Sequence, residues 1–278
     1  MAERTSRKAE LFKHFFLCFI LFFAFFPLYV MIVVSFKSND QFTNNPWFFD
    51  SISTWHWENW IKGWNTVSTY IANSIVVSVS AVIVCLFMGI LSSYVLARYR
   101  FPGRTILYYG IVSSMFLPGT AATLVTLFTL LRSLNLINSL LALIIVGAVG
   151  GQIVCIFILK QFIEDIPKEL FESAEIDGAG HLQSIFHIVL PLSGPIVGTL
   201  AIMQFLRNWN NLMLPLIVIR DEYLLTVPVG LMRLDGEYVK EWGELMAGYT
   251  IASIPLVILF IFTMKLFIRG LTAGAVKG

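Results

Sequence analysis

Long apolar runs dominate the chain, and polar residues are confined to shorter stretches between them. Six runs are almost free of charge for about 20 residues or more, the length of a helix that crosses about 30 Å of hydrocarbon. They cover residues 15–36, 67–97, 105–131, 133–159, 188–219 and 245–264. The runs lack the strict alternation of a membrane β-barrel. We therefore predict an all-α integral membrane protein, one domain over residues 1–278 with six transmembrane helices.

Composition and charge narrow the class of protein further. The 278 residues are 57% hydrophobic and 13% charged, whereas a soluble domain has roughly 25% charged residues. A water-soluble fold is thereby excluded. The net charge of +2 gives no reason to expect a nucleic-acid partner. Each of Cys18, Cys85 and Cys155 lies inside an apolar run, which favours buried, inert thiols over disulfides.

Lys and Arg near the ends of the runs fall into two groups on opposite sides of the predicted membrane. The larger group is Arg4, Arg7, Lys8, Lys13, Arg98, Arg100, Arg104, Lys160, Lys168, Lys265, Arg269 and Lys277. The smaller group is Lys37, Lys62, Arg132, Arg220, Arg233 and Lys240. Because basic residues are enriched on the cytoplasmic side, we predict that both termini are cytoplasmic. The first run exceeds the apolar core of a signal peptide, so we expect it to remain as a span.

The connection between the fourth and fifth predicted spans, about residues 160–190, is far longer than two helices need. Pro167 suits the start of a short helix, and Gly178 suits a left-handed residue that ends it. An apolar face then recurs at Leu182, Ile185, Phe186, Val189 and Leu190 and ends at Pro191. We predict a short helix, a glycine turn and an amphipathic helix against the bundle. The loop is either a solvated connector or a docking surface for a partner.

Motifs in this loop resemble those of a known family. Glu172-Ser173-Ala174, Asp177-Gly178-Ala179 and Leu190-Pro191 resemble the EAA motif of bacterial ABC importer permeases. Ser173 stands where that family usually has Ala, which exchanges one small residue for another. The segments Tyr94–Phe101 and Asn208–Asn211, with Leu214-Pro215 and the ending Gly270–Gly278, look like the smaller maltose-type sugar permease subunit.

The resemblance implies a heteromeric importer in the bacterial cytoplasmic (inner) membrane. Its partners would be a second homologous permease, a cytoplasmic ABC ATPase dimer, an extracellular or periplasmic sugar-binding protein, and membrane lipid. ATP and Mg²⁺ would bind to the ATPase. The residues implied to couple this chain to the ATPase are Glu172, Ser173, Ala174, Asp177, Gly178 and Ala179. The tail would also touch the ATPase through Thr272, Gly274 and Lys277, unless it is simply a disordered basic tail.

No motif for chemistry is visible in the chain itself. A GxxxxGK[ST] phosphate loop, HExxH and GxSxG are all absent from the sequence. His181 and His187 lie six residues apart, which places them on different faces of a helix. We therefore expect a transport subunit rather than an enzyme, with no metal and no cofactor of its own.

The fifth span carries a polar stripe, which we define as Gln204, Arg207, Asn208 and Asn211. At about 100° per residue these side chains occupy roughly a third of the helix circumference. Arg207 lies about 24 Å along the helix from Pro191. It either snorkels to the outer headgroups or faces a water-filled substrate path. Asn73 and Gln152 are further candidates for that path, although hydrogen bonds between helices are the simpler interpretation.

These observations lead to one functional hypothesis with alternatives. The chain is predicted to be the permease subunit of an ATP-driven importer of a sugar or oligosaccharide. Alternatives are an ABC permease for another solute, an ATP-independent secondary transporter, and a membrane scaffold with no conduit. Five tryptophans within residues 37–65 indicate rings at the membrane surface, or else contact with a binding protein.

Overall fold

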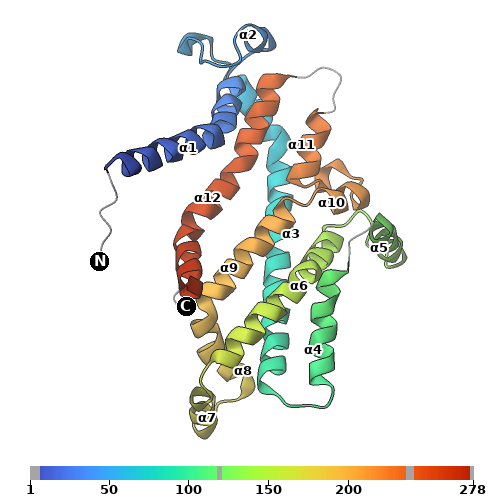
Figure 1. Ribbon diagram of the computed structural model, residues 1–278. Coiled ribbons are helices and arrows are strands. Elements are labelled where there is room, and N and C mark those ends of the chain that lie inside the picture. The colour runs from blue at the N-terminus through green and yellow to red at the C-terminus, as the bar shows by residue number, and fades with distance from the viewer. Residues whose placement is uncertain (1–6, 118–120, 236–240, 276–278) are drawn as a thin grey trace. The chain divides into compact units, whose positions relative to one another are not determined.

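The computed structural model describes residues 7–117, 121–235 and 241–275, and its regular structure in these residues is helical (Figure 1). The longer helices are α1 (Arg7–Ser35), α3 (Glu58–Arg98), α6 (Leu140–Asp165), α9 (Leu190–Trp209) and α12 (Trp242–Ala275). The shorter ones are α2 (Asn39–Asn44), α4 (Arg104–Ser113), α5 (Ala121–Ser133), α7 (Lys168–Ile176), α8 (His181–Ser184), α10 (Met213–Val218) and α11 (Val227–Asp235). Single turns are η1 (Ile52–Thr54), η2 (Ser114–Phe116), η3 (Ile185–Val189) and η4 (Glu222–Leu224).

Five helical segments of the described chain are long and apolar enough to cross a membrane. They are Phe12–Ser35, Glu58–Arg98, Leu140–Asp165, His181–Trp209 and Trp242–Met264. Each overlaps one predicted span, so an all-α membrane fold is confirmed. The predicted third span, 105–131, is instead divided between α4 and α5. Leu117 is extended, at φ −72° and ψ 122°, because Pro118 follows it and disfavours helical backbone at the preceding residue.

The helix that carries the predicted apolar face continues past Pro191. It runs from α8 through η3 into α9, and η3 is a single π-helical turn in which Leu190 N–H bonds to the Ile185 carbonyl. A π-turn widens the helix locally, which accommodates Pro191, a residue that lacks a backbone N–H donor. Ile185 and Val189 are buried, whereas Leu182 and Phe186 are exposed. The predicted apolar face therefore divides between the bundle and its surroundings.

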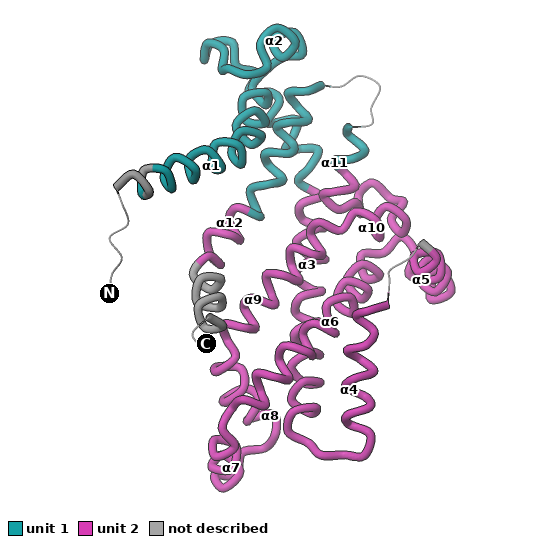
Figure 2. Tube along the Cα trace, viewed as in Figure 1, with its two compact units in different colours: residues 1–68, 231–256 teal, residues 69–230, 257–278 magenta. Residues whose placement is uncertain are grey.

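The chain folds as two compact units, residues 1–68 with 231–256 and residues 69–230 with 257–278 (Figure 2). In the first unit, an aromatic cluster surrounds Phe36. The ring of Phe36 contacts Phe49, Trp55, Trp57 and Trp60, with centroids 4.6–6.3 Å apart. Much of the tryptophan-rich segment thus packs on itself.

The second unit holds the core around which the candidate site is built. Buried apolar residues from α3, α6, α7, η3 and α9 form one cluster, including Tyr94, Leu159, Phe171, Ile185 and Leu200. Cys85 and Cys155 lie within it as free thiols, with their Sγ atoms 3.5 Å apart. Cys18, which we predicted to be buried, is instead exposed on α1. At the ends of α4 and α6, Glu164 pairs with Arg104 at 2.6 Å and with Lys160 at 2.7 Å. The Arg104–Glu164 pair joins α4 to α6, whereas the Lys160–Glu164 pair lies within α6.

Candidate functional site

The loop between α6 and α9 has the helix and turn that the sequence predicts. Helix α7 follows the extended residues Ile166 and Pro167 and ends at Ile176, two residues before Gly178, whose φ is +81°. Gly178 N–H bonds to Glu175 O at 3.0 Å, and Ala179 N–H bonds to Ala174 O at 2.8 Å. This pair of bonds is a Schellman motif, which requires a left-handed residue at the position of Gly178. The sequence prediction of a left-handed stop is confirmed.

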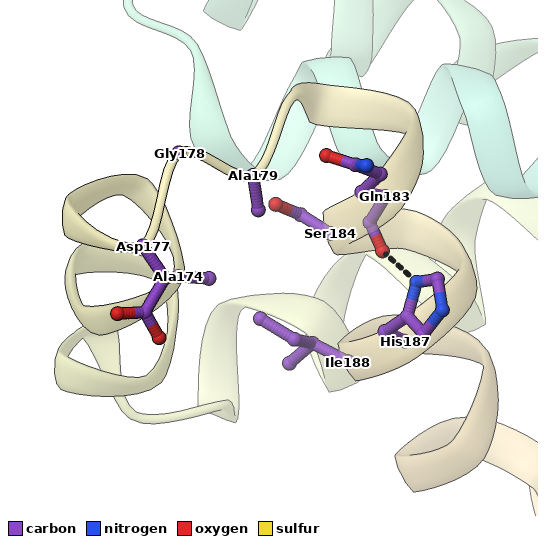
Figure 3. A pocket seen from close by; sticks show the side chains of 8 residues that line it. All are labelled: Ala174, Asp177, Gly178, Ala179, Gln183, Ser184, His187 and Ile188. Atoms are coloured by element: carbon purple, nitrogen blue, oxygen red, sulfur yellow. Dashed lines mark hydrogen bonds between the residues drawn. The ribbon is translucent and has the colours of Figure 1, made fainter.

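The predicted coupling residues lie around this turn. Glu172, Ser173, Asp177 and Gly178 are exposed, and Ala174 and Ala179 are partly buried. With Gln183, Ser184, His187 and Ile188, the residues Ala174 and Asp177–Ala179 line a shallow pocket of about 250 Å³ (Figure 3). Ile176 is 86% exposed although it is apolar. The outer surface of α7 thus combines carboxylates, small residues and one bare isoleucine.

Phe171 anchors α7 to the helix bundle, a role that sequence reasoning missed. Its side chain is 2% exposed, and the Arg98 guanidinium carbon lies 3.8 Å from the centroid of its ring. The Tyr94 ring lies beside it at 6.4 Å. Phe171 directly precedes Glu172, and an aromatic residue beside the motif was the available signal.

The Gly178 turn is also held by contacts on its α8 side. Gly180 N–H donates to Gln183 Oε1 at 2.8 Å, and this bond starts α8. The His181 ring packs edge-on against Tyr99, with centroids 5.2 Å apart. His187 Nδ1 lies 3.0 Å from the Gln183 carbonyl oxygen. Both histidines therefore have structural contacts, and the described residues contain no group of three or more His, Cys, Asp or Glu suited to a metal ion.

The polar stripe of α9 packs against a glycine-rich face of α6. Gln204 is 4% exposed, and its Nε2 donates to Gly147 O at 2.6 Å. A Cβ added at Gly151 would lie 2.0 Å from Gln204 Oε1, and one added at Gly147 would lie 2.4 Å from Asn208 Oδ1. The glycines are thus needed for the amides to fit between the two helices.

Arg207 of the polar stripe contacts the backbone of α6. Its side chain is exposed and its Nη1 donates to the carbonyl oxygen of Gly150. A helical carbonyl normally accepts a bond from within its own helix, so this interaction adds a second donor to α6. The guanidinium is held by the neighbouring helix.

The remaining candidates for the substrate path also make bonds within the second unit. Asn73 Nδ2 donates to the carbonyls of Tyr223 and Leu225, at 2.8 and 3.0 Å. With its amide oriented to satisfy both partners, Gln152 donates to Cys85 O at 3.1 Å and accepts from Gly89 N at 2.8 Å. Asn211 Oδ1 accepts from Leu214 N at 3.3 Å, at the start of α10. Hydrogen bonds between or at the ends of helices are what the structure shows for these residues.

Residues 85–273 match the model of a protein family described as "Binding-protein-dependent transport system inner membrane component". The chain belongs to this family. The match contains both the α7 loop and the polar stripe. It makes the chain a multi-pass membrane component of a transport system and not an enzyme, and it decides against the secondary transporter and the scaffold.

Individual relatives agree with this assignment. The chain is 34% identical to the probable ABC transporter permease protein YurM of Bacillus subtilis, over 91% of this chain and 84% of that protein. It is 35% identical to the arabinooligosaccharides transport system permease protein AraQ of Halalkalibacterium halodurans, over 94% of each chain. It is 30% identical to the melibiose/raffinose/stachyose import permease protein MelC of Bacillus subtilis, over 91% of this chain and 92% of that protein.

A solved structure shares the fold. It is a chain of a bacterial ABC transporter involved in the import of the acidic polysaccharide alginate, with a TM-score of 0.81. The two chains are 19% identical, and the likeness covers 94% of this chain and 98% of the other.

Of the predicted tail, Thr272 and Gly274 belong to the backbone of α12, and Lys277 lies outside the described residues.

Proposed function

We propose that this chain is the permease subunit of an ATP-driven importer for a sugar or oligosaccharide. Family membership supports a permease that works with a binding protein and an ATPase. The relatives AraQ and MelC are named for oligosaccharide transport, which supports a sugar as substrate. In this proposal the partners are a second homologous permease, a cytoplasmic ATPase dimer that binds ATP and Mg²⁺, and an external sugar-binding protein.

The topology of the second unit supports six spans. The end of α3 meets α7 through Arg98 and Phe171, and α6 ends just before α7 in the chain. Helices α3 and α6 therefore run in the same direction, and the chain between them must return across the membrane. Helices α4 and α5, of 10 and 13 residues, measure about 15 and 20 Å and together suffice for a broken crossing of about 30 Å. With six spans, both termini lie on the cytoplasmic side, with α7.

The observation that carries coupling to the ATPase is the construction of α7. Its inner face is fixed by the buried ring of Phe171, its end is fixed by Gly178, and its outer face is exposed. A partner that pushes on such a helix moves the bundle, because the buried Phe171 ring and the Gly178 turn both connect the helix rigidly to it. We propose that ATP-driven closure of the ATPase moves α7 and thereby opens the bundle outward, and that hydrolysis resets it.

The substrate path is proposed to include the exposed members of the polar stripe. Arg207 is exposed and Asn211 is partly exposed, whereas Gln204 and Asn208 are buried against α6. A sugar needs donors and acceptors for its hydroxyl groups, which guanidinium and amide groups supply. Competition of unlabelled sugars, amino acids and polyamines with the uptake of a labelled oligosaccharide tests the substrate class.

Gly178 provides the test of coupling. A Cβ added at Gly178 meets no atom within 4 Å, so we expect the effect of Gly178→Val to come from the left-handed backbone. We expect the variant to lose co-purification of the ATPase and sugar-stimulated hydrolysis. Gly178→Asn should retain both, because Asn tolerates this conformation.

Gly103→Val is the matched control for this experiment. Gly103 has φ +82° and also has no neighbour within 4 Å of an added Cβ, but it lies in the turn between α3 and α4. The strain is therefore equal while α7 is untouched. Equal loss of the ATPase in both valine variants, or none in Gly178→Val, would contradict the proposal.

A further inference from the structure

Two shallow grooves meet along the last turns of α3. One, of about 340 Å³, is lined by Leu91, Tyr94, Val95, Tyr99, Arg100, Phe101, His181, Leu182 and Ile185. The other, also about 340 Å³, is lined by Leu91, Ser92, Val95, Leu96, Phe101, Leu107, Ile111 and Ile156. They share Leu91, Val95 and Phe101, and we call the pair the α3 groove. It lies between α3 and α8 on one side and between α3 and α4 on the other.

The walls of the α3 groove are mostly apolar, and several of the apolar side chains are exposed. Val95 is 44%, Leu107 is 51% and Leu182 is 63% exposed. Leu91 and Val95 belong to a helix that is long and apolar enough to cross the membrane. Leu91 lies about 10 Å from the end of α3 at Arg98, so the groove runs from the membrane surface into the hydrocarbon of one leaflet. An alkyl chain therefore has access to it from the side.

The mouth of the groove is positively charged. Arg98 lies over the Phe171 ring and Arg104 pairs with Glu164, but Arg100 is exposed and makes no ion pair with a residue in the described part of the chain. None of the lining residues is acidic. Arg binds phosphate through two parallel N–H···O bonds, and basic pockets between membrane helices bind anionic lipid headgroups.

We propose that the α3 groove binds an anionic phospholipid of the leaflet on the α7 side of the membrane. The phosphate lies at Arg100, and one acyl chain lies against Leu91 and Val95. The apolar walls give affinity for the chain of any phospholipid, and the unpaired guanidinium selects those with a net negative headgroup. The bound lipid contacts α3 and the start of α8, the elements that hold the two sides of the α7 loop.

Native mass spectrometry of the full-length chain, purified in mild detergent and titrated with a single lipid, tests this proposal. We expect phosphatidylglycerol to bind about fivefold more tightly than phosphatidylcholine, the ratio for one basic residue near an anionic lipid surface. Arg100→Gln should remove that preference, because it weakens phosphatidylglycerol binding more than phosphatidylcholine binding. Arg132→Gln is the matched control, because Arg132 is also exposed but lies at the end of α5.

Blocking the groove tests the acyl-chain part of the proposal independently. Val95→Trp places a large ring between the two halves of the groove and should reduce binding of both lipids. Leu107→Trp fills the part of the groove between α3 and α4, and it serves as the test variant if Val95→Trp does not fold. Equal affinity of the wild type for the two lipids, or unchanged phosphatidylglycerol binding in Arg100→Gln and the tryptophan variant, overturns the proposal. Binding to the isolated chain but not to the assembled importer assigns the groove to a partner subunit and overturns it as well.

Discussion

Replacing Gly151 with Ala should weaken the packing of α6 on α9. The added Cβ would lie 2.0 Å from Gln204 Oε1 and 2.5 Å from Gln204 Cδ, distances that real contacts do not reach. The Gln204 amide cannot move away freely, because the side chain is 4% exposed and its Nε2 donates a hydrogen bond to Gly147 O at 2.6 Å. The methyl group must therefore break that bond or separate the helices.

The magnitude follows from three contributions. Overpacking a filled site costs about 1–3 kcal/mol. Loss of a hydrogen bond between membrane helices costs about 0.6–1.7 kcal/mol. Alanine regains about 1 kcal/mol over glycine through helix propensity. The expected net loss in the free energy of unfolding is about 0.6–3.7 kcal/mol.

The assay is unfolding of the purified chain in mixed micelles, monitored by tryptophan fluorescence. Gly110→Ala is the matched control, because Gly110 is also helical and a Cβ there meets no atom within 4 Å. It should be neutral or slightly stabilising. The double variant Gly151→Ala with Gln204→Ala removes the clash, so the two single effects should fail to add by at least about 1 kcal/mol.

Two results would refute this reasoning. If Gly151→Ala is as stable as Gly110→Ala, the close approach of Gln204 to α6 is not part of the folded protein. If Gly151→Ala is destabilised but the double variant is simply additive, the cost arises somewhere other than at Gln204.

Further predictions concern the α7 loop and the ends of the helices. Phe171→Ala should lower stability by about 3–5 kcal/mol through loss of a buried ring. Ile176→Ser, at an 86% exposed site, should leave the unfolding midpoint unchanged but weaken ATPase co-purification; equal effects on both readouts would contradict it. Glu164→Gln leaves the nearly buried Lys160 without its carboxylate partner. It should lower the free energy of unfolding by about 1–2 kcal/mol in the same assay, a cost between those of exposed and of buried ion pairs. Asn138→Ala should cost about 2–3 kcal/mol, because Asn138 has φ +60° and accepts two backbone N–H bonds, whereas Asn138→Asp should be nearly neutral.

Much of the fold was predictable because membrane spans are determined by composition and length. The apolar runs located five long helices, and the Gly178 turn was predictable because few residues other than glycine adopt its backbone conformation. The break between α4 and α5 was missed, although Pro118 was visible, because Pro within membrane helices often produces only a kink. The direction of the chain on either side of such a residue depends on packing that the sequence pattern does not express.

The candidate site was only partly predictable for a different reason. Periodicity placed Gln204, Arg207 and Asn208 on one face of a helix, but it carries no information about what that face meets. The glycines of α6 determine this contact. The carbonyls of Gly147 and Gly150 accept bonds from α9, and the missing side chain of Gly151 leaves room for Gln204. Polar residues on one span and glycines on another should be considered together, because each explains the presence of the other.

The packing of the stripe also limits how this permease can move. Gln204 and Arg207 both donate to carbonyls of α6, so sliding α9 along α6 would break both bonds. Gln204 is buried, so no water replaces the partner that its amide would lose. Rotation of α6 and α9 as one rigid pair keeps both bonds intact. Movement is then left to the joints on either side of the pair, which are the π-turn η3 and the break after Trp209. The π-turn η3 lies between the α7 loop and α9. A displacement of α7 therefore reaches the α6–α9 pair through η3, where the α-helical hydrogen-bond pattern is already interrupted.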